Sequence, residues 1–482
     1  MQINYRSIDE IQAKNDVWVF IPKQDKETTQ AQLPAFLDQV LDPKSMIDGL
    51  KKEVTVYHNK EVTVHFFYIN KANFISVKTA AAEAIYLRHK HAAAVSVSLD
   101  AQYMKPYLLE ALAEGFWWGA QNLGLHKSES RLEASWGLTV YGNLPLDEGS
   151  AALQRGSHTG EILQRIGSLV NEPGNVCTPR FMADFVVKES LTRSIQVQVH
   201  DASAIQEKGL WALWNVGKGS SYPPVLIEMD YHPPQATRTI GLVGKGVTFD
   251  TGGVSLKDGK NMHYMKSDMG GAAAVIGTIL AAADCGLPYR IVGIVPSAEN
   301  HIDRLAYRPG DVIPSYSGKT IEIINTDAEG RLLLADGISY ILKNYKLDHL
   351  IDLATLTGSA VQTLGYQGAA LFCNDESLAD ALRQSSAECG EKIWPFPLWE
   401  EYQKELESTI ADIRHFHNSP LAGAIVAAKF LESFLDGFPS WAHLDIAPVA
   451  LKETVFSKEK IGTGFGIDLL IRWLTDMHEA SR

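Results

Sequence analysis

The sequence contains few cysteines, and their spacing excludes the usual cysteine-based frameworks. Only four occur among 482 residues, at Cys177, Cys285, Cys373 and Cys389. None forms a C-x-x-C pair, so neither a disulfide framework nor a thiolate zinc site is indicated. No segment reaches the ~18 uninterrupted apolar residues of a membrane span. Residues 1–16 lack the basic patch and apolar run of a secretory signal. We therefore expect a cytoplasmic protein without a membrane partner.

Positive charge is scarce relative to negative charge. Lys plus Arg number 44 and Asp plus Glu number 57, which gives a formal net charge of −13. This balance argues against nucleic acid as the main ligand. The chain is 45% hydrophobic and 21% charged, a composition that indicates a folded globular protein and excludes a largely disordered one.

The two ends of the chain differ in chemical content. Residues 1–150 mix short apolar runs with helical stretches, so we predict a small N-terminal α/β domain there. These residues hold no acidic, histidine-rich or glycine-rich cluster that would indicate chemistry. Residues 151–170 have the pattern of a connecting helix, and turn residues follow at 171–179. Residues 171–482 are predicted to form a larger catalytic α/β domain with a mostly parallel central sheet flanked by helices.

Within the larger domain, strand-like and helical patterns alternate. The strands are predicted at 239–244, 290–295 and 349–353, and the helices at 270–283 and 332–344. This alternation is typical of β-α-β units, which place successive parallel strands side by side. In such a sheet, the loops at the carboxyl ends of the strands bind ligands.

Two stretches place ionisable side chains in glycine-rich turns beside these elements. One is VGKGVTFDTGGVSLKDGKNMHYMKSDMGG at 243–271, and the other is NTDAEGRLLLAD at 325–336. Four carboxylates gathered from them would repel one another strongly. Two divalent cations would remove that repulsion, and oxygen ligands suit Zn, Mn, Mg or Co. Such a metal pair can share carboxylates and a bridging hydroxide. The candidate groups are Lys245, Asp250, Lys257, Asp268, Asp327 and Glu329.

Simpler structural interpretations exist for the same residues. Thr326 and Glu329 have the T-x-x-E spacing of a helix capping box, and Asp268 has the position of a helix N-cap. Lys257 taken alone is typical of a solvated surface lysine. Only the joint occurrence of these groups favours a metal site over the separate interpretations.

At these residues the sequence resembles the leucyl aminopeptidase family, the dinuclear metal cytosol aminopeptidases. NTDAEGRL at 325–332 matches the family signature in full, and the pattern GKGVTFDTGG…LK…NM..MK.DMGGAA matches with unbroken spacing over 244–273. NEPGNVCTP, VGKGS, AYRPGD, DLATLTG, AGAIVAAKFL and WAHLDIA also match, so the resemblance covers roughly residue 171 to the end. His263 stands where the family usually has Asp.

The resemblance implies a metal-dependent aminopeptidase that releases N-terminal amino acids, with a leucine-type preference, from peptides. A hydroxide activated by two divalent ions per subunit, zinc or manganese with magnesium or cobalt as alternatives, would attack the peptide bond. The tighter ion would be held by Lys245, Asp250, Asp268 and Glu329. The more exchangeable ion would be held by Asp250, Asp327 and Glu329.

The same resemblance assigns the remaining site residues. Lys257 would stabilise the oxyanion, and Arg331 would hold a bicarbonate ion that serves as general base. The substrate-binding residues would be Met265, Asn325, Thr355, Leu356 and Gly358. The resemblance also implies a homohexamer.

Two other functions stay open on the residues alone. A metal pair of this kind could act on a phosphate ester, although Lys257 is not accompanied by a further basic cluster. The N-terminal domain could bind another macromolecule such as DNA, although the net charge of −13 argues against that as the main role.

Overall fold

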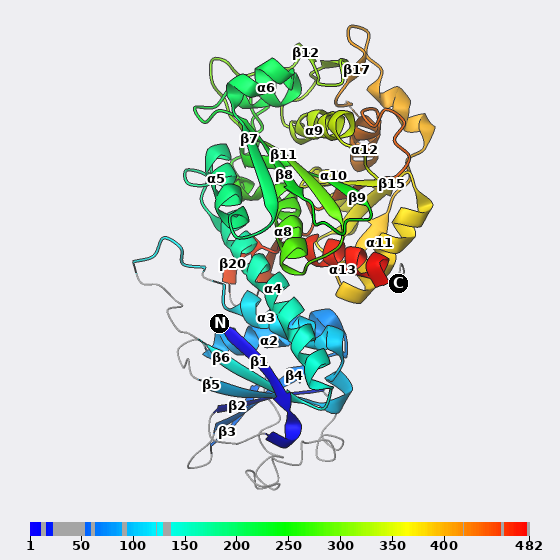
Figure 1. The fold of residues 1–482 in the computed structure, drawn as a ribbon. Coiled ribbons are helices and arrows are strands. Elements are labelled where there is room, and N and C mark those ends of the chain that lie inside the picture. The colour runs from blue at the N-terminus through cyan, green and yellow to red at the C-terminus, as the bar shows by residue number, and fades with distance from the viewer. Residues whose placement is uncertain are drawn as a thin grey trace. The chain divides into compact units, whose positions relative to one another are not determined.

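The computed structural model describes residues 1–10, 16–22, 54–58, 63–88, 94–121, 123–128, 136–417, 419–454 and 457–479. These residues divide into two compact units, Met1–Arg165 and Ile166–Arg482, drawn in blue to cyan and in cyan-green to red in Figure 1. The division falls inside helix α4 (Leu146–Asn171), which contains the predicted connecting helix. The predicted three-part division of the chain stays a prediction.

The N-terminal unit is built on one six-stranded sheet. The strand order is β1-β6-β5-β2-β4-β3, and every neighbouring pair is parallel except β3 with β4. The strands are β1 (Gln2–Ser7), β2 (Asp16–Pro22), β3 (Val54–His58), β4 (Thr63–Ile69), β5 (Ala94–Leu99) and β6 (Gly137–Gly142). The helices are η1 (Ile8–Glu10), α2 (Phe74–Arg88), η4 (Ala101–Tyr103) and α3 (Pro106–Gly119), followed by most of α4. This mixture confirms the predicted α/β class of the unit.

The C-terminal unit is built on a nine-stranded sheet. Its order is β16-β15-β18-β14-β9-β11-β8-β7, and β10 pairs with β11 beside this path. The strands are β7 (Ile195–His200), β8 (Val225–Tyr231), β9 (Thr239–Gly244), β10 (Gly246–Asp250), β11 (Arg290–Asn300), β14 (His349–Ala354), β15 (Ala369–Cys373), β16 (Ile393–Pro395) and β18 (Trp441–Asp445). The central strands β18, β14, β9 and β11 are mutually parallel, which confirms the predicted mostly parallel centre.

Two smaller sheets and a set of helices complete this unit. The small sheets are formed by β12 (Val312–Pro314), β13 (Thr320–Glu322) and β17 (Ile413–Arg414), and by β19 (Leu451–Thr454) and β20 (Ser457–Gly462). The helices are α5 (Pro179–Ser190), α6 (Ala202–Lys208), α7 (Trp211–Gly217), η5 (Met262–Ser267), α8 (Gly270–Asp284), α9 (Gly330–Asn344), α10 (Gly358–Leu364), α11 (Glu376–Cys389), η6 (Glu400–Leu406), α12 (Gly423–Glu432) and α13 (Ile467–Glu479).

Helices cover both faces of the central sheet because successive strand residues point to opposite sides. A Cβ atom added at Gly241 of β9 would meet Ile341 of α9 at 3.0 Å. One added three residues later, at Gly244, would lie 2.7 Å from Ala272 of α8. Helix α9 therefore packs on one face and α8 on the other, as Figure 1 shows.

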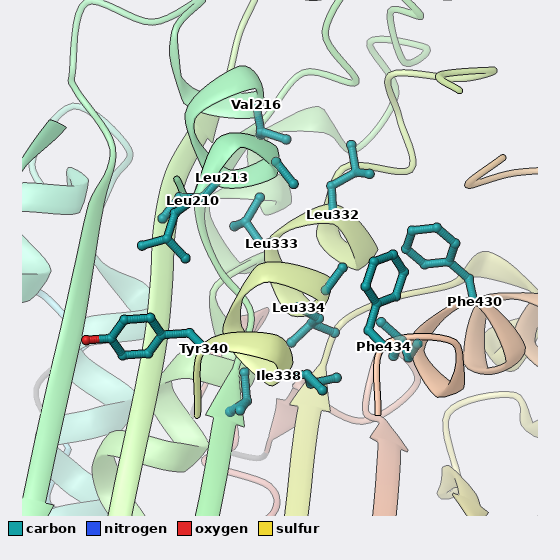
Figure 2. Packing of buried hydrophobic residues seen from close by; sticks show 14 of the residues in the cluster. Leu210, Leu213, Val216, Leu332, Leu333, Leu334, Ile338, Tyr340, Phe430 and Phe434 are labelled. Atoms are coloured by element: carbon teal, nitrogen blue, oxygen red, sulfur yellow. The ribbon is translucent and has the colours of Figure 1, made fainter. Parts of the chain in front are cut away.

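The face covered by α9 holds a large apolar core. Leu213 of α7 and the leucines of α9 belong to one buried cluster with Phe430 of α12 and with Phe434, which follows α12. Figure 2 shows α9 between the leucines beside α7 and the two phenylalanines. Leu332, Leu333 and Leu334 are fully buried. Helix α9 is thus held by its apolar side chains, and its first residues are fixed where the turn carrying Asp327 and Glu329 ends.

The face covered by α8 is packed backbone to backbone. A Cβ atom on Gly271 would lie 2.0 Å from the carbonyl oxygen of Leu353 in β14. That same oxygen accepts a hydrogen bond from the Lys245 N–H at 3.0 Å. The absence of a side chain at Gly271 therefore lets α8 approach the strand ends at which Lys245 and Thr355 begin their loops.

Replacing Gly271 with alanine is expected to destabilise the chain by about 3 kcal/mol, because the added methyl group overpacks this contact. The midpoint of thermal unfolding should fall by roughly 5–10 °C. Gly259 is the matched control, because no atom lies within 4 Å of a Cβ built there. A Gly271→Ala midpoint as high as that of Gly259→Ala would show that α8 can move away without cost.

Among the described residues, no helix is both long enough and apolar enough to cross a membrane.

Candidate metal centre

Two adjacent parallel strands bring the first pair of site residues together. Strands β9 and β14 pair in parallel, so the residues that follow them, Lys245 and Thr355, leave the same edge of the sheet. The Lys245 carbonyl oxygen accepts a hydrogen bond from the Ala272 N–H of α8 at 2.8 Å. The Lys245 ammonium donates to the carbonyl oxygen of Thr355 at 2.9 Å. Both the backbone and the head of Lys245 are therefore fixed.

Lys245 stands between two buried carboxylates. Its Nζ atom lies 2.7 Å from Asp268 Oδ2 and 2.9 Å from Glu329 Oε1. The other oxygen of Asp268 accepts a hydrogen bond from the Thr355 hydroxyl at 2.7 Å. Asp268 arrives from the turn before α8, and Glu329 from the turn before α9. This half of the site thus joins three loops from three different parts of the sequence.

Lys257 organises the other half. Its Nζ atom lies 2.8 Å from Asp250 Oδ2, and it also forms an ion pair with Asp327. The loop that carries Lys257 turns back toward Asp250 because Gly252 and Gly253 adopt φ values of +85° and +64°. Glycine allows this conformation at no steric cost. The Lys257 side chain keeps about a quarter of its surface exposed, at 24%. It can therefore contact a ligand in the cavity as well as its two carboxylates.

Asn300 was missed by the sequence analysis. It is fully buried, and its amide donates to Asp250 Oδ1 at 2.8 Å and to the Thr326 carbonyl oxygen at 3.0 Å. It therefore orients the carboxylate of Asp250 and the turn that carries Asp327. A sequence signal exists, since Asn300 ends a long apolar strand of the same parallel sheet. The partners of Asn300, however, lie 26 and 50 residues away along the chain.

The carboxylates of three residues converge closely. One ligand atom each from Asp250, Asp327 and Glu329 all lie within 4.8 Å of one another. They border a cavity of about 570 Å³ in the C-terminal unit. The cavity is also lined by Lys245, Lys257, Met265, Asp268, Arg331, Thr355, Leu356 and Gly358.

Among the described residues, Asn325 is the predicted site residue that lies outside this lining. Its side-chain oxygen accepts a hydrogen bond from the Asp327 N–H at 2.9 Å, and its carbonyl oxygen contacts His415 Nε2 at 2.8 Å. It therefore shapes the ligand-bearing turn. A direct contact between Asn325 and substrate stays a prediction.

Burial and mutual repulsion perturb the titration of these carboxylates. Burial, with the nearby charge of Asp250, raises the pKa of Asp327 to about 7. Burial likewise raises the pKa of Asp268 well above its ordinary value. Glu329 differs, because the ammonium groups of Lys245 and Lys257 outweigh its burial and lower its pKa. The structure therefore concentrates more negative charge than two lysines can neutralise.

The simpler structural interpretations of these residues are wrong. Helix α9 has Glu329 at its N-cap with no capping hydrogen bond from the side chain, which pairs with Lys245 instead. Helix α8 is preceded by Met269 at the N-cap, and the carboxylate of Asp268 is directed to Lys245 and Thr355. Lys257 is not a free surface lysine, since it pairs with two carboxylates.

Arg331 is a buried cation near the start of α9. Only 4% of its surface is exposed, and burial lowers its pKa to about 10. Its Nη1 atom donates to the His415 carbonyl oxygen at 2.7 Å, and its guanidinium lies 5.4 Å from the centre of the Phe416 ring. Its Nε atom has no hydrogen-bond partner among the described residues. The arrangement leaves a buried donor group at the cavity that an anion could satisfy.

His415 is the second residue that the sequence analysis missed. Its ring is fully buried, and its Nδ1 and Nε2 atoms contact the carbonyl oxygens of Glu322 and Asn325 at 3.1 and 2.8 Å. Burial and the charge of Arg331 lower the pKa of His415 to about 4. His415 therefore links Arg331, which donates to its carbonyl oxygen, to the turn that carries Asp327, which its ring contacts.

Comparisons with known proteins place the C-terminal unit among peptidases. A model of the catalytic domain of the cytosol aminopeptidase family matches residues 165–471. A probable cytosol aminopeptidase of Chlorobaculum tepidum is 47% identical over 325 residues, which make up 66% of this chain and 64% of that relative. The chain thus matches slightly less than two thirds of that relative's length. One of Geobacter sp. (strain M21) is 41% identical over 393 residues, 80% of this chain and 79% of the relative.

The solved structures that resemble this one extend over nearly the whole chain. The bottromycin maturation enzyme BotP in complex with Mn is 31% identical, with a TM-score of 0.80 over 97% of this chain and 100% of that chain. A second structure of BotP is 30% identical, with a TM-score of 0.81 over the same shares. The likeness therefore includes the N-terminal unit, which the family model does not reach.

Proposed function

Because the chain belongs to the cytosol aminopeptidase family, we propose that it is a metal-dependent aminopeptidase that releases N-terminal residues, leucine foremost, from peptides. The observation that carries this proposal is the convergence of four carboxylates and two lysines on one cavity. No single loop supplies them, so the fold has assembled a charge cluster that costs stability unless it serves a ligand.

The residues present fit two divalent ions. Lys245, Asp250, Asp268 and Glu329 would hold the tighter ion, and Asp250, Asp327 and Glu329 the more exchangeable one. Carboxylate oxygens suit manganese, zinc, magnesium or cobalt, and the complex of BotP with Mn supports manganese among these. Such a pair supplies Lewis-acid activation of a water nucleophile near neutral pH.

The lysines support the same assignment. Burial alone would lower the pKa of Lys245, but the carboxylates of Asp268 and Glu329 raise it in the protein by itself. Divalent cations at these carboxylates would take over that neutralising role and reverse the effect on the amine. A neutral Lys245 amine can then act as a ligand. Lys257 stays cationic beside the cavity, where it would donate to the scissile carbonyl oxygen and stabilise the developing oxyanion.

The lining of the cavity supports an uncharged first side chain. Met265 and Leu356 border the cavity with Thr355 and Gly358. None of these four residues carries a charge, and the first two are flexible apolar side chains. We infer that leucine or methionine is preferred over a charged N-terminal residue.

We further propose that Arg331 holds a bicarbonate ion as general base. Its planar guanidinium suits a carbonate oxygen pair, and its unpartnered Nε atom, buried at a helix N-terminus, favours an anion. Replacing Arg331 with methionine should lower kcat by about 100-fold, within the usual range for a general base. Adding bicarbonate to depleted buffer should accelerate the unmodified enzyme but not the variant.

The matched control for this experiment is Arg308→Met, since Arg308 is exposed and its one ion-pair partner within the described part of the chain is Asp311. That variant should keep the bicarbonate response. If the unmodified enzyme does not respond to bicarbonate at all, the role of the ion is refuted.

The proposed activity is tested with purified protein and leucine p-nitroanilide or Leu-Gly. We expect hydrolysis in the presence of manganese or zinc, and its loss after chelation. Hydrolysis of p-nitrophenyl phosphate without any peptide hydrolysis would contradict the proposal and favour a phosphate ester as substrate.

We also propose a homohexamer in the cytoplasm. The support is the resemblance to the family and the naming of the relatives as cytosol aminopeptidases. Light scattering of the purified protein should give a mass six times the 53.1 kDa of one chain.

A further inference from the structure

Two lysines line the same cavity without a carboxylate partner among the described residues. Lys260 lies in the turn before η5, and Lys460 lies on β20. The lysines of the metal cluster are each paired with two carboxylates. Lys260 and Lys460 therefore differ from them, because their charge is left for a ligand or for solvent.

The acidic side chains that lie close to these lysines in the sequence accept hydrogen bonds from other groups than the lysine ammonium groups. Asp258 also lines the cavity, and its Oδ1 atom accepts a hydrogen bond from the backbone N–H of Lys260 at 3.3 Å. Glu459 precedes Lys460, but its Oε2 atom accepts a hydrogen bond from the Tyr264 hydroxyl at 2.5 Å. This last contact also joins η5 to β20. The two lysine-bearing segments are thus linked to each other at the cavity.

The head of Lys460 is held in place without being neutralised. Its Nζ atom lies 4.2 Å from the centre of the Tyr366 ring, and Tyr366 lines the cavity too. A cation over an aromatic face is attracted to it and keeps its charge. The ring therefore orders the ammonium group and leaves its N–H donors available to a bound anion.

We propose that Lys260 and Lys460 form a carboxylate subsite for the part of the peptide that follows the scissile bond. This rests on the proposed aminopeptidase function, in which the N-terminal residue of the peptide lies at the metal ligands and Met265. The rest of a short peptide then occupies the same cavity and meets the two lysines. The ligand group is a carboxylate, either the C-terminus of a dipeptide or an Asp or Glu side chain.

Charge supports this choice of ligand. The chain carries a net charge of −13, so its general field repels anionic peptides. Lys260 and Lys460 bring the cations that line the cavity to five, against five carboxylates, so the lining does not share the net negative charge of the chain. A lysine head is a point charge that accepts a carboxylate from several directions, which suits peptides of different second residues.

The test compares kcat/KM for Leu-Gly with kcat/KM for its amide, Leu-Gly-NH2, in the metal-loaded full chain. A second pair, Leu-Glu-NH2 and Leu-Gln-NH2, reports on a side-chain carboxylate. In each pair the ratio of the two values cancels differences in the amount of active enzyme. In the unmodified chain, we expect this ratio to be above one for at least one pair. Replacing either lysine should lower the ratio by about fivefold at most, because partly exposed ion pairs are weak.

Three variants and one control resolve the origin of the preference. Lys260→Gln and Lys460→Gln should each lower the ratio, and Asp258→Asn should raise it because a competing carboxylate is removed. Lys452→Gln, an exposed lysine on β19 outside the cavity lining, should leave the ratio unchanged. The preference should also weaken at high salt, which screens charges near the surface.

The outcomes are distinct. If the lysine variants change the kcat/KM ratio of the Leu-Gly pair alone, the peptide C-terminus is the ligand. If they change the ratio of the Leu-Glu pair alone, the side-chain carboxylate is the ligand. A carboxylate preference that both lysine variants retain would belong to the metal ions and overturn the subsite. Failure to hydrolyse any of the four peptides or leucine p-nitroanilide would instead overturn the proposed function itself.

Discussion

Replacing Glu329 with glutamine is expected to remove metal binding and to lower kcat/KM by about 1000-fold. Glu329 is the carboxylate common to both halves of the cluster, since it pairs with Lys245 and lies within 4.8 Å of the ligand atoms of Asp250 and Asp327. It is also 1% exposed. Removing one partner of a buried charge pair leaves the other uncompensated, which typically costs about 3–5 kcal/mol. Glutamine keeps the shape of the side chain, so the loss would be one of charge.

Elemental analysis of the metal-loaded protein measures the first effect, and hydrolysis of leucine p-nitroanilide the second. Glu322→Gln is the matched control, because Glu322 lies on nearby β13 and bonds to the hydroxyl of Ser408 outside the cavity. The control should bind as much metal as the unmodified chain. A Glu329→Gln protein with full metal content and full activity would remove Glu329 from the ligand set.

Replacing Lys257 with methionine is expected to lower kcat by about 100- to 1000-fold while the metal content is unchanged. The reason is that Lys257 is proposed to stabilise the oxyanion and not to ligate an ion. Loss of one oxyanion donor typically has an effect of this size. Because such a donor acts chiefly in the transition state, KM should change little.

A conservative variant separates this role from a structural one. Lys257→Arg keeps the positive charge between Asp250 and Asp327 and should restore part of kcat. Lys188→Met, a change at an exposed lysine of α5, is the control for loss of a positive charge elsewhere. If Lys257→Met loses bound metal to the same extent as it loses activity, this lysine only holds the two carboxylates apart.

Local sequence patterns were sufficient for the elements that carry the site. The predicted strand at 239–244 has the bounds of β9, and the predicted helix at 270–283 is one residue shorter than α8. In both cases an apolar run with a clear period ends at glycine or at a charged residue, so the boundary is a local property. In the N-terminal half, the sequence predicts strands at 17–22, 62–69 and 92–99 and a helix at 103–122, and residues 62, 92, 93 and 122 of these lie outside the described residues.

Contacts between distant segments could not be predicted in the same way. Strand β11 extends five residues beyond the predicted 290–295 because β10 pairs with its second half. That extension places Asn300 against Asp250, a contact across 50 residues. The hairpin of β19 and β20, which carries Lys460, also has no strong local pattern.

The choice between a helix cap and a metal ligand shows the same limit. The residue pattern around Thr326 and Glu329 fits a capping box and a ligand pair equally well. The side chain of Thr326 instead donates to the Gly252 carbonyl oxygen at 2.7 Å, and Glu329 turns to Lys245. Those partners come from the loops after β9 and β10, so only the assembled sheet decides between the two interpretations.

The central claim is that the carboxylates at this cavity bind two divalent ions. Its most direct test is anomalous X-ray diffraction from crystals grown with manganese and soaked with zinc, measured at both metal absorption edges. The account predicts two peaks in the cavity, one beside Lys245 and Asp268 and one beside Asp327, with Asp250 and Glu329 touching both. A cavity with no anomalous peak, or peaks only at surface residues, would contradict it.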